Sequence, residues 1–175
     1  MSTMPATKGL LIKAGSNPNR WTTVVFHHPV FSTKEGRDNT QLRELWKPLF
    51  DRHRVDLVLT GHDHTYGRGR NLPLGVSEVD AGTGTVYVVS VSGPKMYVLD
   101  EEAWWDRAAE NTQLYQVVSV EGDTLRYEAR TAVGDPYDAF DLVKREGLPN
   151  RMIDRTPKGV PERRHHNTIG GTLLS

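Results

Sequence analysis

Two apolar runs separated by an amphipathic segment constrain the fold of this chain more than any other feature. The runs are TTVVFH at 22–27 and VDLVLT at 55–60, and their β-branched and apolar content favours buried strands. Between them, Asp38 and Gln41 resemble a helix capping box, and apolar residues then recur at helical spacing: Leu42, Leu45, Trp46, Leu49 and Phe50. This order predicts a strand–helix–strand unit with a right-handed crossover and parallel strand pairing.

Histidines follow both predicted strands. His27 ends the first strand, and His62 and His64 follow the second. The carboxyl ends of parallel neighbours meet at one edge of a sheet, where α/β proteins bind ligands, so we expect the three rings to converge there. Neutral imidazole is a common ligand of zinc, iron and manganese. In extended backbone, His62 and His64 would project to one side about 6 to 7 Å apart, which suits two ions better than one.

The rest of the chain is predicted to be rich in strands. After a Gly-rich segment at 67–84, strand-like runs occur in TVYVVSVSG, QLYQVVSVEG, TLRYEART and AFDLVK, with a short polar helix expected near DEEAWWDRAAE. Tight turns between the later runs favour antiparallel pairing. We therefore predict an α/β (α+β) domain over residues 1–147, with one βαβ unit followed by a β-rich half. From about residue 147 periodicity is lost, which predicts an irregular tail over 148–175.

Composition removes several classes of function. Lys plus Arg and Asp plus Glu are both 22, so no net field favours nucleic acid or an anionic membrane. The absence of cysteine excludes disulfides, thiolate metal ligands and a cysteine nucleophile. No segment approaches ~20 consecutive apolar residues, and the N-terminus lacks the apolar run of a signal peptide. We expect a soluble chain, and the sequence does not predict its cellular compartment.

The histidine motifs carry a family resemblance. VVFHHP, followed after the predicted helix by VDLVLTGHDHTY, resembles the V-x-x-H and G-H-x-H motifs of the calcineurin-like metallophosphoesterases. The continuation from His62 to Arg68 follows the pattern H-x-H-x-Y-x-R, which is similar to the purple acid phosphatase branch. The resemblance covers roughly residues 17–147. It implies the C-terminal half of an αββα sandwich of the metallophosphoesterase type.

The resemblance also implies an activity and its ligands. The complete family site holds two metal ions, of iron, zinc or manganese, and uses a metal-activated hydroxide to hydrolyse a phosphoester, as acid phosphatases do. By resemblance, His27 and His62 would bind the second ion and His64 the first. His28 is the candidate catalytic histidine, although beside Pro29 it could instead be a turn residue. Candidates for substrate binding or for support behind the ligands are Asp63, Tyr66, Arg68 and Arg37.

The earlier family motifs are not found. The patterns D-x-H/G, G-D-x-x-D/Y and G-N-H/D/E should precede V-x-x-H, but the 26 residues before His27 contain no Asp or Glu. We therefore expect this chain to bind one ion weakly and to hydrolyse little alone. The sequence leaves three origins for the chain open: a gene fragment, a mis-started reading frame, or one of two cooperating chains. A missing N-terminal half-domain or a second chain is therefore a candidate partner. The alternative function is a non-catalytic module with a vestigial two-histidine metal half-site.

Overall fold

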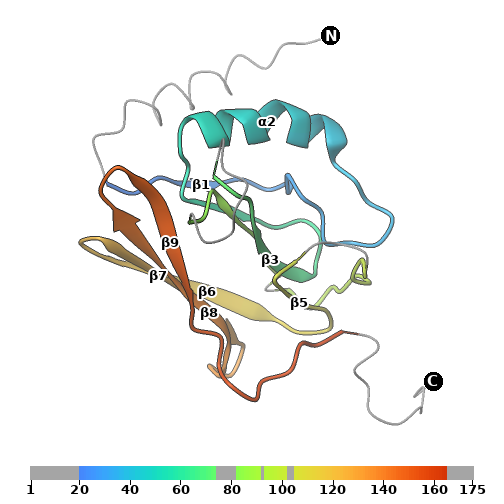
Figure 1. The fold of residues 1–175 in the computed structure, drawn as a ribbon. Helices are drawn as coiled ribbons and strands as arrows, with labels where there is room; N and C mark the ends of the chain where they lie inside the picture. Colours follow the sequence, from blue (N-terminus) through green and yellow to red (C-terminus); the bar gives the residue numbers. More distant parts are fainter. Residues whose placement is uncertain (1–19, 74–81, 92, 102–104, 165–175) are drawn as a thin grey trace, which may run out of the picture.

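The computed structural model describes residues 20–73, 82–91, 93–101 and 105–164. These residues form three layers, with helix α2 above a five-stranded sheet and a four-stranded sheet below it (Figure 1). The predicted α/β (α+β) class is confirmed. The main core fills the space between the two sheets, and a second core lies between the five-stranded sheet and α2.

The five-stranded sheet contains the predicted βαβ unit. Strand β1 pairs in parallel with β2, and β2 pairs in parallel with β4, while β3 runs antiparallel to both β4 and β5. In spatial order the strands are β1 (Thr23–Val25), β2 (Leu57–Thr60), β4 (Val86–Val89), β3 (Tyr66–Arg70) and β5 (Arg107–Ala109). The parallel pairing of β1 and β2 confirms the prediction that their carboxyl ends share one edge.

Helix α2 (Thr40–Arg52) packs its apolar side on β1 and β2. Trp46 and Phe50 are buried as the periodicity predicts, whereas Leu45 is 53% exposed. The capping-box prediction is wrong, because the N-cap is Asn39 and the carboxylate of Asp38 accepts hydrogen bonds from Thr40 and Arg43 instead. Within the described ranges, no helix is long and apolar enough to span a membrane.

The four-stranded sheet is an antiparallel meander. Its strands pair in the order in which they occur in the chain: β6 (Leu114–Glu121), β7 (Thr124–Thr131), β8 (Pro136–Arg145) and β9 (Leu148–Asp154). Strand β9 corrects the prediction of an irregular tail from residue 148. Its apolar alternation is weak, and backbone pairing with β8 holds it in place. The tail histidines and the rest of 165–175 lie outside the described residues.

Strands β3 and β5 were also missed by sequence reasoning. Strand β3 occupies part of the Gly-rich segment, and β5 takes the place of the end of the expected polar helix, whose residues 102–104 lie outside the described part. Gly67 in β3 is required by close packing, because a Cβ there would lie 2.9 Å from Cδ2 of Trp105 and closer still to Thr33. Glycine therefore marks a crowded strand here, not a loop.

On one side of the sandwich, two strand edges have no neighbouring strand among the described residues. Strand β1 is an edge of the five-stranded sheet and β6 is an edge of the four-stranded sheet. The two edges are neighbours, because the indole Nε1 of Trp21 donates to the carbonyl of Gly122 after β6, at 3.0 Å. Valines are exposed on both edges: Val25 by 70%, Val118 by 38% and Val120 by 54%. Exposed apolar side chains on neighbouring edges form a surface to which another strand could add.

Candidate metal centre

His27 and His62 meet at the carboxyl ends of β1 and β2. The backbone N–H of Gly61 donates to the carbonyl of His27 at 3.0 Å, which continues the parallel pairing into both histidine loops. As a result, His62 Nδ1 and His27 Nε2 are 2.9 Å apart. A cavity of about 480 Å³ lies beside them, lined by His27, Gly61 and residues of β1, β2, β4 and β6. The predicted convergence of these two rings is therefore present in the structure.

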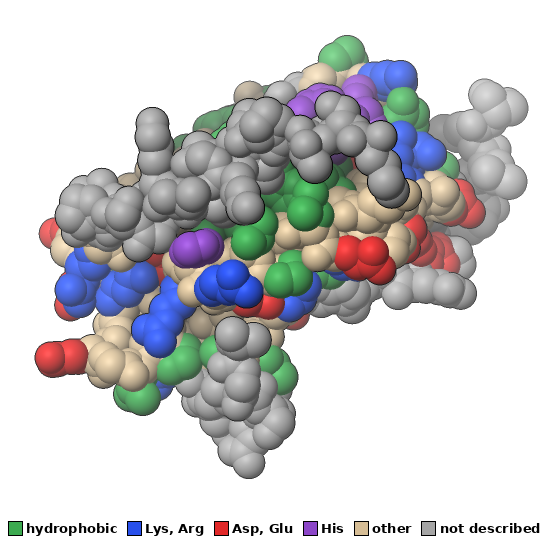
Figure 2. All heavy atoms as spheres, turned by 90° about the horizontal axis from the view of Figure 1, so that it is seen from above, with side chains coloured by type: hydrophobic (Ala, Val, Ile, Leu, Met, Phe, Trp, Pro, Cys, Tyr) green, Lys and Arg blue, Asp and Glu red, His purple; other side chains and the backbone are tan. Residues whose placement is uncertain are grey.

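The spacing of the two nitrogens fits a single metal ion. Imidazole nitrogens bind such ions at about 2.0 to 2.1 Å, so two nitrogens 2.9 Å apart can both reach one ion. His28 completes an exposed cluster of imidazoles, with its ring centroid 4.0 Å from that of His62 and 5.0 Å from that of His27. Figure 2 shows a group of histidine side chains near one edge of this face of the molecule and a separate histidine elsewhere on it.

The ring of His62 is biased toward the form that binds metals. Partial burial lowers the pKa of His62, and the nearby positive charges of His28, Arg37 and His27 lower it further, against a smaller opposing effect of Asp63. A lower pKa keeps the imidazole neutral over a wider pH range. A neutral ring is what a metal ligand requires.

His64 is held separately from the pair. Its Nδ1 lies 2.9 Å from the carbonyl of Lys95, and its ring packs on Tyr97 with centroids 4.9 Å apart. A carbonyl acceptor fixes the hydrogen on Nδ1 and leaves Nε2 with its lone pair, the usual arrangement behind a histidine ligand. Thus His64 is prepared as a ligand, although the described residues contain no group of three or more His, Asp or Glu side chains able to hold one ion.

The backbone of the histidine loop differs from the expected extended form. His62 has φ 74° and His64 has φ 55°, so both lie in the left-handed region that favours glycine. The extended backbone on which the predicted 6 to 7 Å spacing of the two rings was based is therefore absent at His62 and His64. Strained left-handed residues persist only where the surroundings fix them, and they concentrate at functional sites.

Asp63 helps to hold the backbone of the histidine loop in this conformation. Its side chain is fully buried and accepts hydrogen bonds from Ser32 Oγ and the Thr33 backbone N–H, each at 2.7 Å. Arg37 Nη1 forms an ion pair with the same carboxylate at 2.6 Å. Asp63 and Arg37 thus join the loop after β1 to the loop after β2, behind the histidines.

Tyr66 and Arg68 lie between the sheets. Both are buried, and both donate to Asp138 Oδ2 of β8, Tyr66 through its hydroxyl at 2.6 Å and Arg68 through Nε at 2.8 Å. Burial opposes ionisation of Asp138, but Arg68, together with the hydrogen bonds of Tyr66 and Thr156, outweighs it and lowers the pKa of Asp138. Of the two roles expected for Tyr66 and Arg68, this placement favours support behind the ligands over substrate binding, since neither side chain faces solvent. They support the strand that continues from His64.

Several partners of the loop could not be found in the sequence. Lys95 and Tyr97 contact His64 from about thirty residues away, and Ser32 and Thr33 hold Asp63 from a different loop. No spacing or motif links these positions, because the contacts arise from the packing of separate loops at one sheet edge.

Comparisons with known proteins agree with these motifs. The model of the calcineurin-like phosphoesterase family matches residues 3–66, which include His27, His62 and His64. Two relatives, the uncharacterized proteins MT2654 and Rv2577 of Mycobacterium tuberculosis strains CDC 1551 / Oshkosh and ATCC 25618 / H37Rv, are each 34% identical over 89 residues. Each match covers 42% of this chain and 17% of the relative.

The fold comparison extends over nearly the whole chain. The structure of purple acid phosphatase PPD1 from yellow lupin (Lupinus luteus) seeds matches with a TM-score of 0.63 and 16% sequence identity. The match covers 99% of this chain and 32% of the lupin chain. The fold is thus part of a metallophosphoesterase sandwich. The family model and the shared fold agree with the predicted resemblance of this chain to the calcineurin-like metallophosphoesterases, and the match to the lupin protein shows the fold.

Proposed function

We propose that this chain contributes to the metal-dependent hydrolysis of a phosphoester. The observation that carries the proposal is the 2.9 Å approach of His27 Nε2 and His62 Nδ1 at the shared edge of two parallel strands. The match of residues 3–66 to the phosphoesterase family supports the same reaction class. The bound ion would supply positive charge to the phosphoryl oxygens and activate water for attack on phosphorus.

In this proposal each histidine has a distinct role. His27 and His62 hold one ion, and His64, fixed by the carbonyl of Lys95, is available to a second ion. His28 stands beside His62 on the exposed side of the cluster, where it can donate a proton to the leaving oxygen of the substrate. Asp63 and Arg37 keep the two loops in register and do not contact substrate.

The proposed site needs carboxylates that the described residues do not bring to the histidines. Asp63 is enclosed by its own donors, and Asp138 is bound by Arg68 and Tyr66. Without anionic ligands, two cations repel each other and keep too few protein ligands. We propose that a further polypeptide segment, in the same or another chain, supplies these ligands. A non-catalytic module with a two-histidine half-site is the second candidate, and the absence of a larger metal-ligand group in the described part favours it.

Metal binding by histidine variants tests the site directly. We expect calorimetric titration with Zn²⁺ or Mn²⁺ to show one weakly bound ion, and His27→Ala or His62→Ala to reduce its affinity at least about tenfold through loss of a ligand. His53→Ala is the matched control, because His53 follows the far end of α2. Equal affinity in the wild type and both ligand variants would refute the half-site.

Turnover decides between the two functions. We expect little hydrolysis of p-nitrophenyl phosphate by the 175-residue chain with added iron, zinc or manganese. Turnover that appears when a segment carrying the earlier family motifs is added, and that disappears in His62→Ala, would support the enzyme. Absence of turnover in both conditions would favour the non-catalytic module. Strong turnover by the chain alone would contradict the need for added carboxylates.

A further inference from the structure

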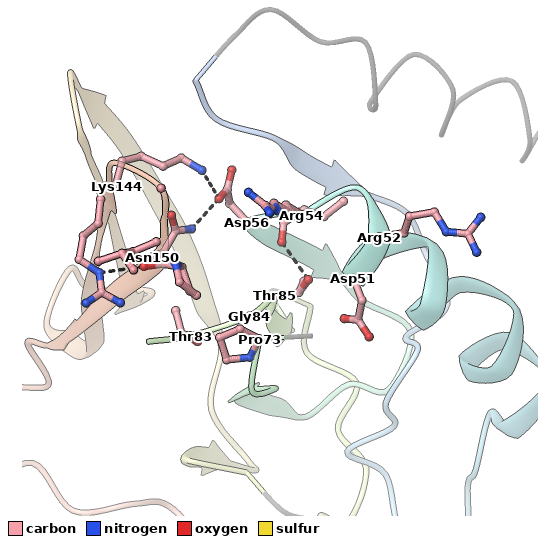
Figure 3. Close-up of a pocket in the computed structure, with 15 residues that line it drawn as sticks. Asp51, Arg52, Arg54, Asp56, Pro73, Thr83, Gly84, Thr85, Lys144 and Asn150 are labelled. Carbon is pink, nitrogen blue, oxygen red and sulfur yellow. Dashed lines mark hydrogen bonds and ion pairs between the residues drawn. The ribbon is translucent and has the colours of Figure 1, made fainter. Parts of the chain in front are cut away.

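A second cavity lies at the end of the sheet opposite the histidines. It is about 450 Å³ in volume and lies between the end of α2, the start of β2 and the turn between β8 and β9 (Figure 3). Volumes of this size are typical of small-molecule sites. None of the histidines of the metal centre lines it, so a ligand there would be independent of the proposed hydrolysis.

The carboxylates of this cavity are already neutralised. Asp56 is 3% exposed and accepts hydrogen bonds from Lys144 Nζ, from Asn150 Nδ2 at 2.6 Å and from the Thr22 backbone N–H at 2.8 Å. Asp51 pairs with Lys47 at 2.7 Å. Arg54 and Arg145 add positive charge to the lining, whereas the side chain of Arg52, although it is part of the lining, points away from the cavity (Figure 3). An excess of positive charge therefore remains around the cavity, and it favours an anionic ligand.

Arg54 occupies a backbone position that normally belongs to glycine. The Val55 N–H donates to the Phe50 carbonyl at 3.0 Å and the Arg54 N–H to the Asp51 carbonyl at 3.2 Å, which together form a Schellman motif at the end of α2. Arg54 is the left-handed residue of this motif, with φ 51°. A side chain here is less favourable than glycine. Such strain, when tolerated, points to a role for the side chain.

The Arg54 side chain lies beside Asp56 in the cavity. In Figure 3, Arg54 and Lys144 lie on either side of Asp56, whereas Arg52 points away from the cavity. No carboxylate among the described residues pairs with Arg54. Its guanidinium is therefore available to an anion, with two parallel N–H donors of the kind that match phosphate oxygens.

A buried hydroxyl in the cavity wall also has no partner among the residues that the structure describes. Thr83 is 3% exposed and lines the cavity, and its Oγ1 forms no hydrogen bond with any described atom. Its backbone N–H is already used, because it donates to the Asn150 carbonyl at 2.8 Å. A buried hydroxyl without a partner is unfavourable. A ligand oxygen in the cavity would accept its hydrogen bond.

From these observations we propose that this cavity binds a small molecule through a phosphate group, held by the guanidinium of Arg54 and the hydroxyl of Thr83, while Lys144 keeps its ion pair with Asp56. The volume leaves room for more than the phosphate itself, so the ligand class is a phosphorylated metabolite of modest size. The site is separate from the metal centre and requires no metal ion.

The test exploits the strained backbone of Arg54. The full chain with His62→Ala, in EDTA, is titrated calorimetrically with inorganic phosphate and with acetate, so that the metal centre plays no part. We expect phosphate to bind and acetate to bind less well. Arg54→Gly should lower phosphate affinity at least about tenfold and yet raise the thermal midpoint of unfolding, because glycine relieves the left-handed strain.

Two further variants separate binding from folding. Thr83→Val keeps the shape of the side chain, and we expect it to weaken phosphate binding several-fold by removing the hydroxyl donor. Arg52→Gln is the matched control, because Arg52 is exposed and turned away from the cavity, and its phosphate affinity should equal that of the parent. Unchanged affinity in Arg54→Gly, or no phosphate binding by the parent at millimolar concentration, would overturn the proposal.

Discussion

Asp63 is buried between two half-exposed histidines, and its donors come from a loop that precedes it by about thirty residues. A carboxylate in this position costs desolvation energy, which Arg37, Ser32 and Thr33 offset. The left-handed backbone of His62 and His64 turns Asp63 inward while the rings stay accessible. At the scale of single residues, the candidate site therefore depends on an ion pair that does not itself bind the ligand.

Replacing this carboxylate should destabilise the fold. We expect Asp63→Asn to lower the free energy of unfolding by about 2 kcal/mol, because Arg37 loses its counter-charge and Thr33 N–H loses an anionic acceptor. This expected loss of stability is smaller than that for a fully buried ion pair, because the Arg37 side chain is 25% exposed. Urea denaturation measures the change. Glu35→Gln, an exposed change in the same loop, should stay within about 0.5 kcal/mol, and an equally small effect of Asp63→Asn would contradict the structural role.

At the scale of elements, β3 and β8 are joined by the buried pair of Arg68 and Asp138. Arg68 donates to both carboxylate oxygens of Asp138, through Nε at 2.8 Å and Nη2 at 3.0 Å. Thr156, just after β9, adds a hydrogen bond to Asp138 at 2.9 Å. The pair therefore fixes the strand that follows His64 against the second sheet.

This pair should make stability depend on pH. Burial opposes ionisation of Asp138, but Arg68, Tyr66 and Thr156 together outweigh it, so the pKa in the folded state lies below the value of about 3.9 expected in the unfolded chain. The ionised group therefore adds stability above about pH 4, and that stability is lost as the pH falls below this value. We expect Asp138→Asn to cost about 3 kcal/mol at pH 7, with a smaller difference from wild type near pH 3.

Denaturation at several pH values provides the measurement. Asp154→Asn is the control, because Asp154 is exposed on β9 and its side chain caps only the backbone of Thr156. A cost for Asp138→Asn that is independent of pH would show that the ionised carboxylate is not the stabilising form.

The elements that the sequence predicts well are those with an apolar run or apolar residues at helical spacing, although β1 proves to be largely exposed. Strands β1, β2 and β4 and helix α2 have strong apolar patterns, and the placement of His27 and His62 follows from two of them. Strand β3 was not predicted because its glycines suggested a loop, whereas Gly67 is required by close contact with Trp105. Strand β9 was not predicted because its own pattern is weak and backbone pairing with β8 holds it in place. The loop geometry around His64 depends on Lys95, and such contacts between distant loops leave no periodic signal.

At the scale of the whole molecule, the open side formed by β1 and β6 should promote association. Val118 and Val120 are exposed on β6, which pairs with a strand on one side only in the described part of the chain. We expect the chain to self-associate, and the double change Val118→Lys and Val120→Lys to shift it toward monomer, because edge lysines oppose strand addition. Sedimentation velocity at several concentrations measures this shift. Val133→Lys is the control, as Val133 is 84% exposed in the turn between β7 and β8. A wild type that stays monomeric throughout would contradict the expectation.

The consecutive pairing of β6 to β9 also bears on how the chain folds. Each strand of this meander pairs with the next one along the chain through a short turn, whereas β1, β2 and β4 must be brought together across a helix and a long connection. Closing short loops costs less entropy, so we expect the meander to form first and the histidine-bearing sheet to assemble on it. Pulse-labelled hydrogen exchange should then show early protection of amides in β7 and β8, ahead of those in β1 and β2.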